Sequence, residues 1–175
     1  MNTQERIIKA TIDIIDKNGY ENLSLRTLTK DLGLTTGAFY KHFESKEKLF
    51  EEVAIKLSKD FVNNISLNLK DSPKIRLLKI AKYFCLYVTK HFNLADFLFF
   101  NSTVVNSYLV NSGQYKLLTE MKKIISQINK EKNISDQDLF IQIWSFIQGY
   151  AVLIKNKTVN YNEELVEQTL NEFLS

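Results

Sequence analysis

Residues that break helices are scarce in this chain. Its 175 residues include one proline and five glycines, whereas long stretches carry apolar residues at the three- and four-residue intervals of an amphipathic helix. No segment keeps the apolar–polar alternation of a half-buried strand. Because 45% of the residues are hydrophobic, the chain has enough apolar surface to fold. The sequence therefore predicts an all-α protein of about nine helices joined by short turns.

The composition also limits which kinds of site and which cellular compartment we expect for this protein. Its single cysteine, Cys85, excludes an internal disulfide and an all-cysteine metal site, and its apolar neighbours favour a small buried side chain. Apolar runs such as Phe97–Phe100 are far shorter than the ~20 residues that span a membrane, and the N-terminus does not resemble a signal peptide. We therefore expect a cytoplasmic protein without a membrane segment, cofactor or metal. The net charge of +3 neither requires nor excludes nucleic acid.

Capping residues and glycines divide the N-terminal part of the chain. A first helix is expected over residues 3–18, with Thr3 as its cap and Gly19 as its end. Ser24 is expected to cap a second helix that ends at the turn residue Gly33.

A third short helix is expected over residues 37–43, and Ser45 starts a longer one. Ser72-Pro73 then marks the start of a helix that reaches about residue 91. Further helices are expected from Asn93 and over residues 101–111, 114–132 and 135–155, followed by a last one starting at Asn160 or Asn162. This order predicts a small domain over residues 1–50 and a larger helical domain over residues 51–175.

The second and third helices have the layout of a helix-turn-helix unit, whose second helix enters the major groove of DNA. Gly33 allows the tight turn between them. Four apolar residues are expected to pack inward: Leu28, Leu34, Phe39 and Phe43. The residues left outside are Thr35, Thr36, Gly37, Lys41 and His42. Small residues among them would let the helix backbone approach base edges and phosphates.

The run Leu28–Phe43, followed by Ser45–Phe50, resembles the N-terminal domain of the TetR family of bacterial transcriptional repressors. The resemblance covers residues 3–53, and beyond it only the lengths and order of the helices match. Two positions depart from the family pattern, since Thr29 and Leu32 stand where alanine is common. Helix packing inside the motif is therefore expected to differ slightly.

The resemblance implies specific DNA contacts. Arg26 matches a position that reaches a base edge, where arginine suits guanine, and Thr36 and Gly37 match base-reading positions. Tyr40 and Lys46 match phosphate contacts, as does His42, and such contacts give affinity without sequence information. The full expected set is Ser24, Arg26, Thr35, Thr36, Gly37, Ala38, Tyr40, Lys41, His42 and Lys46.

Simpler interpretations of three of these residues stay open. Arg26 has Glu21 and Asp31 as alternative ion-pair partners. Tyr40, taken alone, is more typical of a half-buried aromatic side chain, and Lys46 of a solvated charge.

The helix over residues 135–155 is apolar on nearly every side, so it needs cover on two faces. A second subunit or the chain's own core would provide it, and Gly149 would let another helix come close. The resemblance implies a two-fold homodimer in which the last two helices form a four-helix bundle. Its two recognition helices would then lie one or more DNA turns of ~34 Å apart on a palindrome. The expected interface residues are Trp144, Gln148, Ala151, Val166, Leu170 and Phe173.

Aromatic residues gather in the middle of the chain. Such residues are usually plain core, but a pocket lined by aromatic rings also suits an apolar effector. The resemblance implies an inducer site, for which the candidates are Tyr83, Phe84, Tyr87, Phe100, Tyr108 and Trp144. The expected function is a ligand-responsive regulator, a repressor that a small apolar or aromatic effector releases from its double-stranded operator.

An enzyme and a helical dimer without DNA activity are the two alternatives to a DNA-binding regulator. The sequence has no phosphate-binding glycine loop and no His-Glu-x-x-His motif, and its two histidines are far apart, so an enzyme is not expected. A helical dimer that binds small molecules but not DNA is the remaining alternative.

Overall fold

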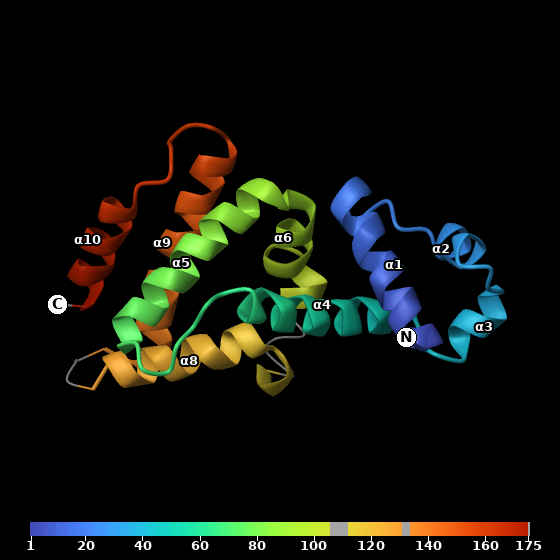
Figure 1. Cartoon of the computed structure of the whole chain (residues 1–175), viewed down its shortest axis with the longest axis horizontal. Coiled ribbons are helices and arrows are strands. Elements are labelled where there is room, and N and C mark those ends of the chain that lie inside the picture. Colours follow the sequence, from blue (N-terminus) through green and yellow to red (C-terminus); the bar gives the residue numbers. More distant parts are fainter. Residues whose placement is uncertain (106–111, 131–133, 175) are drawn as a thin grey trace. The chain divides into compact units, whose positions relative to one another are not determined.

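The computed structural model describes residues 1–105, 112–130 and 134–174 and confirms the all-α prediction (Figure 1). Within these ranges nine α-helices and one 3-10 helix have both ends described. They are α1 (Thr3–Asn18), α2 (Leu25–Asp31), α3 (Thr36–Tyr40), α4 (Lys46–Asn63), α5 (Pro73–Lys90), α6 (Phe92–Phe99), η1 (Ser112–Gln114), α8 (Lys116–Ile128), α9 (Asp136–Lys155) and α10 (Glu163–Leu174). Residues 102–105 are also helical, and the rest of the helix expected over 101–111 lies outside the described residues.

The chain forms two compact units. The first comprises residues 1–59 and 91–115, and the second comprises residues 60–90 and 116–175. Residues 91–115 thus join the N-terminal helices. This division differs from the expected boundary at residue 50, and the functional division stays a prediction.

The cap of α1 is Asn2 and not Thr3. The Asn2 side chain accepts a hydrogen bond from the Glu5 backbone N–H at 2.8 Å, and the Glu5 carboxylate accepts from the Asn2 backbone N–H at 2.9 Å. This reciprocal pair satisfies two N–H groups that have no partner inside the helix. At the other end Gly19 has a φ of 78°, as the predicted helix end requires.

Within the first unit, α6 packs against α1. The Nδ1 atom of His91 lies 3.3 Å from both carboxylate oxygens of Asp16, and the Asn93 amide donates to the Asp16 backbone carbonyl at 2.8 Å. Phe97 of α6 also contacts Phe50 of α4, with ring centroids 5.1 Å apart. The small N-terminal domain is therefore held by a helix that follows it by some 40 residues of sequence.

In the second unit, α5 packs against α8, α9 and α10. Ser72 accepts from the Ile75 backbone N–H as α5 begins, and Ser135 caps α9 by accepting from the Asp138 backbone N–H at 3.0 Å. Phe84 of α5 is fully buried, with its ring 4.9 Å from that of Trp144 on α9. In the described parts of the chain, none of the helices is long and apolar enough to cross a membrane.

Candidate nucleic-acid interface

A sharp turn joins α2 to α3 (Figure 1). Gly33 has a φ of 67°, which L side chains rarely adopt, and the Leu34 N–H donates to the Thr29 carbonyl at 2.8 Å. Leu28 and Phe39 are fully buried beneath the turn, and Leu34 is half-buried. The inward packing predicted from the sequence therefore holds the two helices, with Leu34 only partly covered.

The third helix, α3, is shorter than predicted. Thr35 caps it, since its hydroxyl accepts from the Ala38 backbone N–H at 3.0 Å, and the helix ends at Tyr40. His42 and Phe43 follow in a turn that is tied back through their N–H groups to the Phe39 carbonyl, at 2.9 and 3.1 Å. This turn buries Phe43 while His42 stays exposed.

Most of the residues expected to contact DNA are exposed to solvent. Tyr40 is 53% exposed although its ring contacts Phe39 at 5.2 Å, and Ala38 is half-buried. The other exposed members of the expected set are Ser24, Arg26, Thr35, Thr36, Gly37, Lys41 and His42. The start of α3 and the turn after it therefore offer small polar, cationic and aromatic side chains on the surface.

Gly37, in contrast to Gly33, is not required by its backbone conformation. Its φ is not in the left-handed region, and a Cβ atom added there would meet only the Thr35 hydroxyl, at 3.9 Å. Neither backbone conformation nor internal packing therefore requires a glycine at position 37. A partner that approaches the backbone from outside would require one.

Arg26 is exposed and forms neither of the ion pairs weighed from the sequence, with Glu21 or with Asp31, among the described residues. Ser24 has a structural task, since its hydroxyl accepts from the Thr27 backbone N–H and caps α2. Its side chain is nevertheless exposed beside Arg26.

Lys46 has internal partners that sequence reasoning missed. Its ammonium donates to the Leu23 carbonyl at 2.7 Å and lies 5.2 Å from the centre of the Phe50 ring. Leu23 immediately precedes the α2 cap, so this lysine ties the start of α4 to the start of α2. No local pattern indicates such a bond, because the two residues are 23 positions apart.

Thr29 stands where the family pattern has alanine. Its side chain is buried, and its hydroxyl is hydrogen-bonded. Its Oγ1 atom donates to the Leu25 carbonyl at 2.9 Å and lies 3.2 Å from the Arg26 carbonyl. Leu32, the other departure, is half-buried at the end of α2. Its carbonyl accepts from the Arg6 guanidinium at 3.3 Å, which links α2 to α1.

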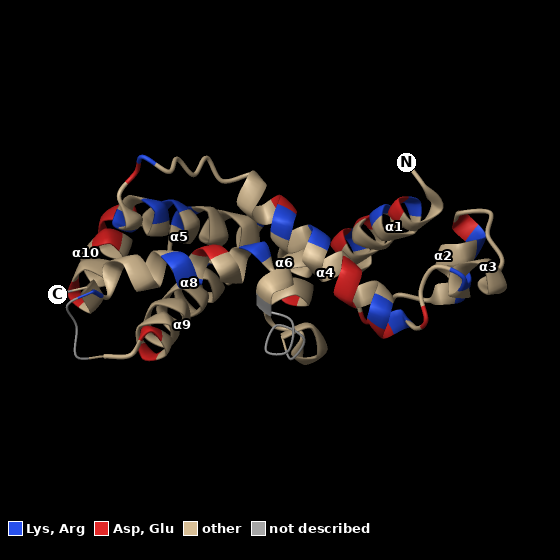
Figure 2. Cartoon of the chain, turned by 90° about the horizontal axis from the view of Figure 1, so that it is seen from below, with Lys and Arg blue, Asp and Glu red and all other residues tan. Residues whose placement is uncertain are grey.

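Positive charge is not concentrated on this part of the molecule. Figure 2 shows both signs of charge along α1 and α4. At the start of α4 the hydrogen bond from Ser45 lowers the pKa of Glu47, and this carboxylate adds a negative charge beside Lys46. Any affinity for DNA therefore depends on the position of a few cationic residues.

The residues expected at a dimer interface fall into two groups. Ala151, Val166 and Leu170 are buried inside a single chain, so a second copy cannot contact their side chains in this conformation. Trp144, Gln148 and Phe173 are half-buried. The exposed apolar residues of α9 and α10 are Ile141, Leu153 and Leu165, with exposed fractions of 50%, 44% and 43%.

The expected effector residues do not all share one unit. Phe84 is fully buried core, and Tyr83, Tyr87 and Trp144 are half-buried in the same unit. Phe100, 39% exposed, belongs to the other unit, and Tyr108 lies outside the described residues.

Neither metal binding nor thiol chemistry is indicated in the described parts of the chain. No three His, Cys, Asp or Glu side chains there are grouped so that they could hold a metal ion. Burial raises the pKa of the Cys85 thiol to about 12, so at neutral pH it is not a thiolate nucleophile.

Residues 7–53 match the family model described as bacterial regulatory proteins, tetR family. An uncharacterized HTH-type transcriptional regulator of Bacillus subtilis, YerO, is 35% identical over 79 residues. That match covers 43% of this chain but only 27% of YerO, so the chain spans about a quarter of this relative's length.

Solved structures extend the likeness of fold to the whole chain. A putative TetR family regulator from Vibrio parahaemolyticus has a TM-score of 0.74 and 17% identity over 99% of this chain and 97% of its own. BioQ, crystallised with its double-stranded DNA operator, has a TM-score of 0.68 and 20% identity over 99% and 98%. At these identities the comparison establishes the fold.

Proposed function

Because residues 7–53 match the model of the tetR family of bacterial regulatory proteins, we propose that the chain is a transcriptional regulator of this family that binds double-stranded DNA through α3. Gly37 carries this proposal most directly. It is exposed at the start of α3, and neither its backbone conformation nor its contacts with the described residues explain its missing side chain. A DNA backbone or base edge lying against α3 does explain it.

The surrounding residues have complementary roles in this proposal. Arg26, exposed at the start of α2, and Thr36, exposed at the start of α3, read base edges. Tyr40 and Lys41 contact phosphates and set the register of the protein on the duplex. His42 adds a third phosphate contact from the turn that follows α3.

The proposed regulator works as a homodimer on a palindromic operator. Support comes from α9, whose outer face carries exposed residues at four-residue steps: Ile141, Ser145, Gly149 and Leu153. Such a row is a ridge that packs well against the same row of a second helix. No atom of the described residues lies within 4 Å of a Cβ added at Gly149, so a partner helix has room to approach.

The proposed output is repression in the bacterial cytoplasm, relieved by a small apolar or aromatic effector. The half-buried rings of Tyr83, Tyr87 and Trp144 support an aromatic-lined site in the second unit. An effector that binds one conformation better shifts the population towards it. Release follows if the recognition helices of the favoured conformation no longer match the spacing of successive major grooves.

A titration of fluorescent duplex DNA at increasing salt tests DNA binding. We expect affinity to fall linearly with log salt concentration, with a slope of about −0.9 per phosphate neutralised. Tyr40→Phe should weaken binding to every sequence about equally, whereas Arg26→Ala should cost about 1–3 kcal/mol at one base pair and relax its specificity. The absence of salt-dependent binding would leave the helical dimer without DNA activity as the better reading.

A further inference from the structure

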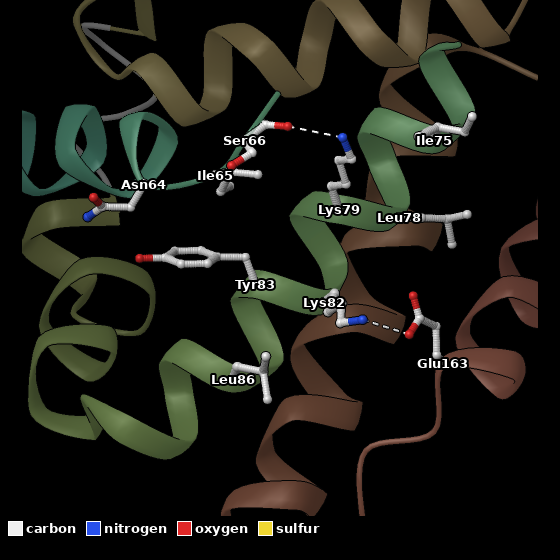
Figure 3. A pocket seen from close by; sticks show the side chains of 10 residues that line it. All are labelled: Asn64, Ile65, Ser66, Ile75, Leu78, Lys79, Lys82, Tyr83, Leu86 and Glu163. Atoms are coloured by element: carbon white, nitrogen blue, oxygen red, sulfur yellow. Dashed lines mark hydrogen bonds and ion pairs between the residues drawn. The ribbon is translucent and has the colours of Figure 1, made fainter. Parts of the chain in front are cut away.

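A groove opens on the second unit between the end of α4, the outer face of α5 and the start of α10 (Figure 3). Its volume is about 490 Å³, within the range of sites for small molecules. Asn64, Ile65 and Ser66 form one side, and Glu163 stands at the start of α10. All of these residues belong to one compact unit.

One face of α5 forms the largest part of the groove. The six residues that α5 contributes follow helical steps of three and four, in contrast to the opposite face, which is buried against α8 and α9. These residues are Ile75, Leu78, Lys79, Lys82, Tyr83 and Leu86. Ile75 is 46% exposed and Leu86 is 50% exposed, although both are large apolar side chains. A helix that is apolar on both faces has a second surface to cover.

Two ammonium groups line this apolar surface. The Lys82 ammonium lies 2.7 Å from a Glu163 carboxylate oxygen, and both side chains are largely exposed, at 46% and 64%. An ion pair this exposed contributes little, so another carboxylate can replace Glu163 at small cost. Lys79 donates to the Ser66 carbonyl at 3.1 Å and to Asp71 at 2.7 Å, which leaves one of its three N–H groups for a further acceptor.

We propose that this groove binds an amphipathic anion, a carboxylate with an apolar chain or ring. The apolar part lies along Ile75, Leu78 and Leu86, and the carboxylate accepts hydrogen bonds from Lys82 and Lys79. The Tyr83 side chain, which reaches from α5 towards the end of α4 in Figure 3, closes one side. Each ammonium is paired with one carboxylate, Glu163 or Asp71. An anion is favoured because the exposed Lys82–Glu163 pair can exchange its carboxylate and Lys79 keeps one N–H group for a further acceptor.

Isothermal titration of the full-length protein with dodecanoate, below its micelle concentration and without DNA, tests the site. We expect saturable binding of one dodecanoate per chain, and about tenfold weaker binding of 1-dodecanol, which has the same chain without the charge. Because no DNA is present, the outcome is independent of the proposed regulatory function. Equal affinities for dodecanoate, 1-dodecanol and dodecylamine would overturn the proposal.

Variants locate the anion within the groove. Lys82→Gln should weaken dodecanoate binding about fivefold, while Lys74→Gln, on the same helix but outside the groove, should not change it. Leu86→Ser should also weaken binding, with Leu69→Ser as the control at a leucine that is 88% exposed elsewhere. Loss of affinity in the two control variants would show non-specific adsorption and contradict the site.

Glu163→Gln gives a test in the opposite direction. Removal of its negative charge frees the Lys82 ammonium, so dodecanoate should bind about two- to fivefold more tightly, the value of an exposed ion pair. A variant that merely damaged the fold would weaken binding. Unchanged or weaker binding would therefore overturn the assigned role of Lys82.

Discussion

At the scale of single residues, two glycines of the helix-turn-helix illustrate two different constraints. Gly33 adopts a backbone conformation that strains any L side chain, whereas Gly37 has ordinary backbone geometry and room for a Cβ atom, which would meet the Thr35 hydroxyl at 3.9 Å. The first glycine is therefore required by the fold. The second is explained only by the proposed approach of DNA to α3.

This difference gives a paired prediction. Gly33→Ala should lower the free energy of unfolding by about 1 kcal/mol, because alanine is strained at positive φ. Gly37→Ala should leave that free energy unchanged or raise it by up to about 1 kcal/mol, since alanine favours helix, yet weaken DNA binding about tenfold or more. Urea unfolding and DNA titration measure the two effects. A Gly37→Ala variant with full DNA affinity would argue against α3 as the recognition helix.

At the scale of elements, the helix starts were predicted well because caps are local. Ser24 and Ser45 accept backbone hydrogen bonds at the starts of α2 and α4, and Ser72, Ser135 and Asn162 do so at α5, α9 and α10. Helix ends were less accurate: α3 stops at Tyr40, three residues before the predicted end. Residues 41–43 instead form a turn, in which Phe43 is buried.

The link between α2 and α4 gives a prediction at this scale. Lys46→Met removes the hydrogen bond to the Leu23 carbonyl and the contact of the charge with the Phe50 ring. We expect a loss of about 1 kcal/mol in the free energy of unfolding, measured with urea. Lys41→Met is the matched control: it lies on the exposed surface after α3 and should weaken DNA binding while stability stays the same. Equal stability of both variants would contradict the structural role of Lys46.

At the scale of the whole molecule, helices distant in sequence share a unit. α6 lies with α1 and α4, joined by the bonds of His91 and Asn93 to Asp16 and by the contact of Phe97 with Phe50. A boundary drawn from sequence composition near residue 50 does not reveal this arrangement. The reason is that α6 has no local signal for its packing partner.

The proposed dimer is tested at this scale. Leu153→Lys and Ile141→Lys place charges on the exposed ridge of α9 and should shift the protein from dimer to monomer in sedimentation experiments. Leu69→Lys, at an exposed leucine away from that ridge, is the control and should leave the dimer intact. Affinity for palindromic DNA should fall with the loss of the dimer. A fully dimeric Leu153→Lys variant would place the interface elsewhere.

The sequence alone determined the all-α class, most helix starts and the helix-turn-helix with its exposed residues, because scarce breakers, side-chain caps and apolar spacing act over a few residues. Only the tertiary structure decided which residues already have contacts inside the chain. It paired Lys46 with Leu23, buried Ala151, Val166 and Leu170 inside one chain, and placed six residues of α5 along a groove. Contacts of this kind join segments far apart in the chain, so they depend on how the helices pack and have no local pattern.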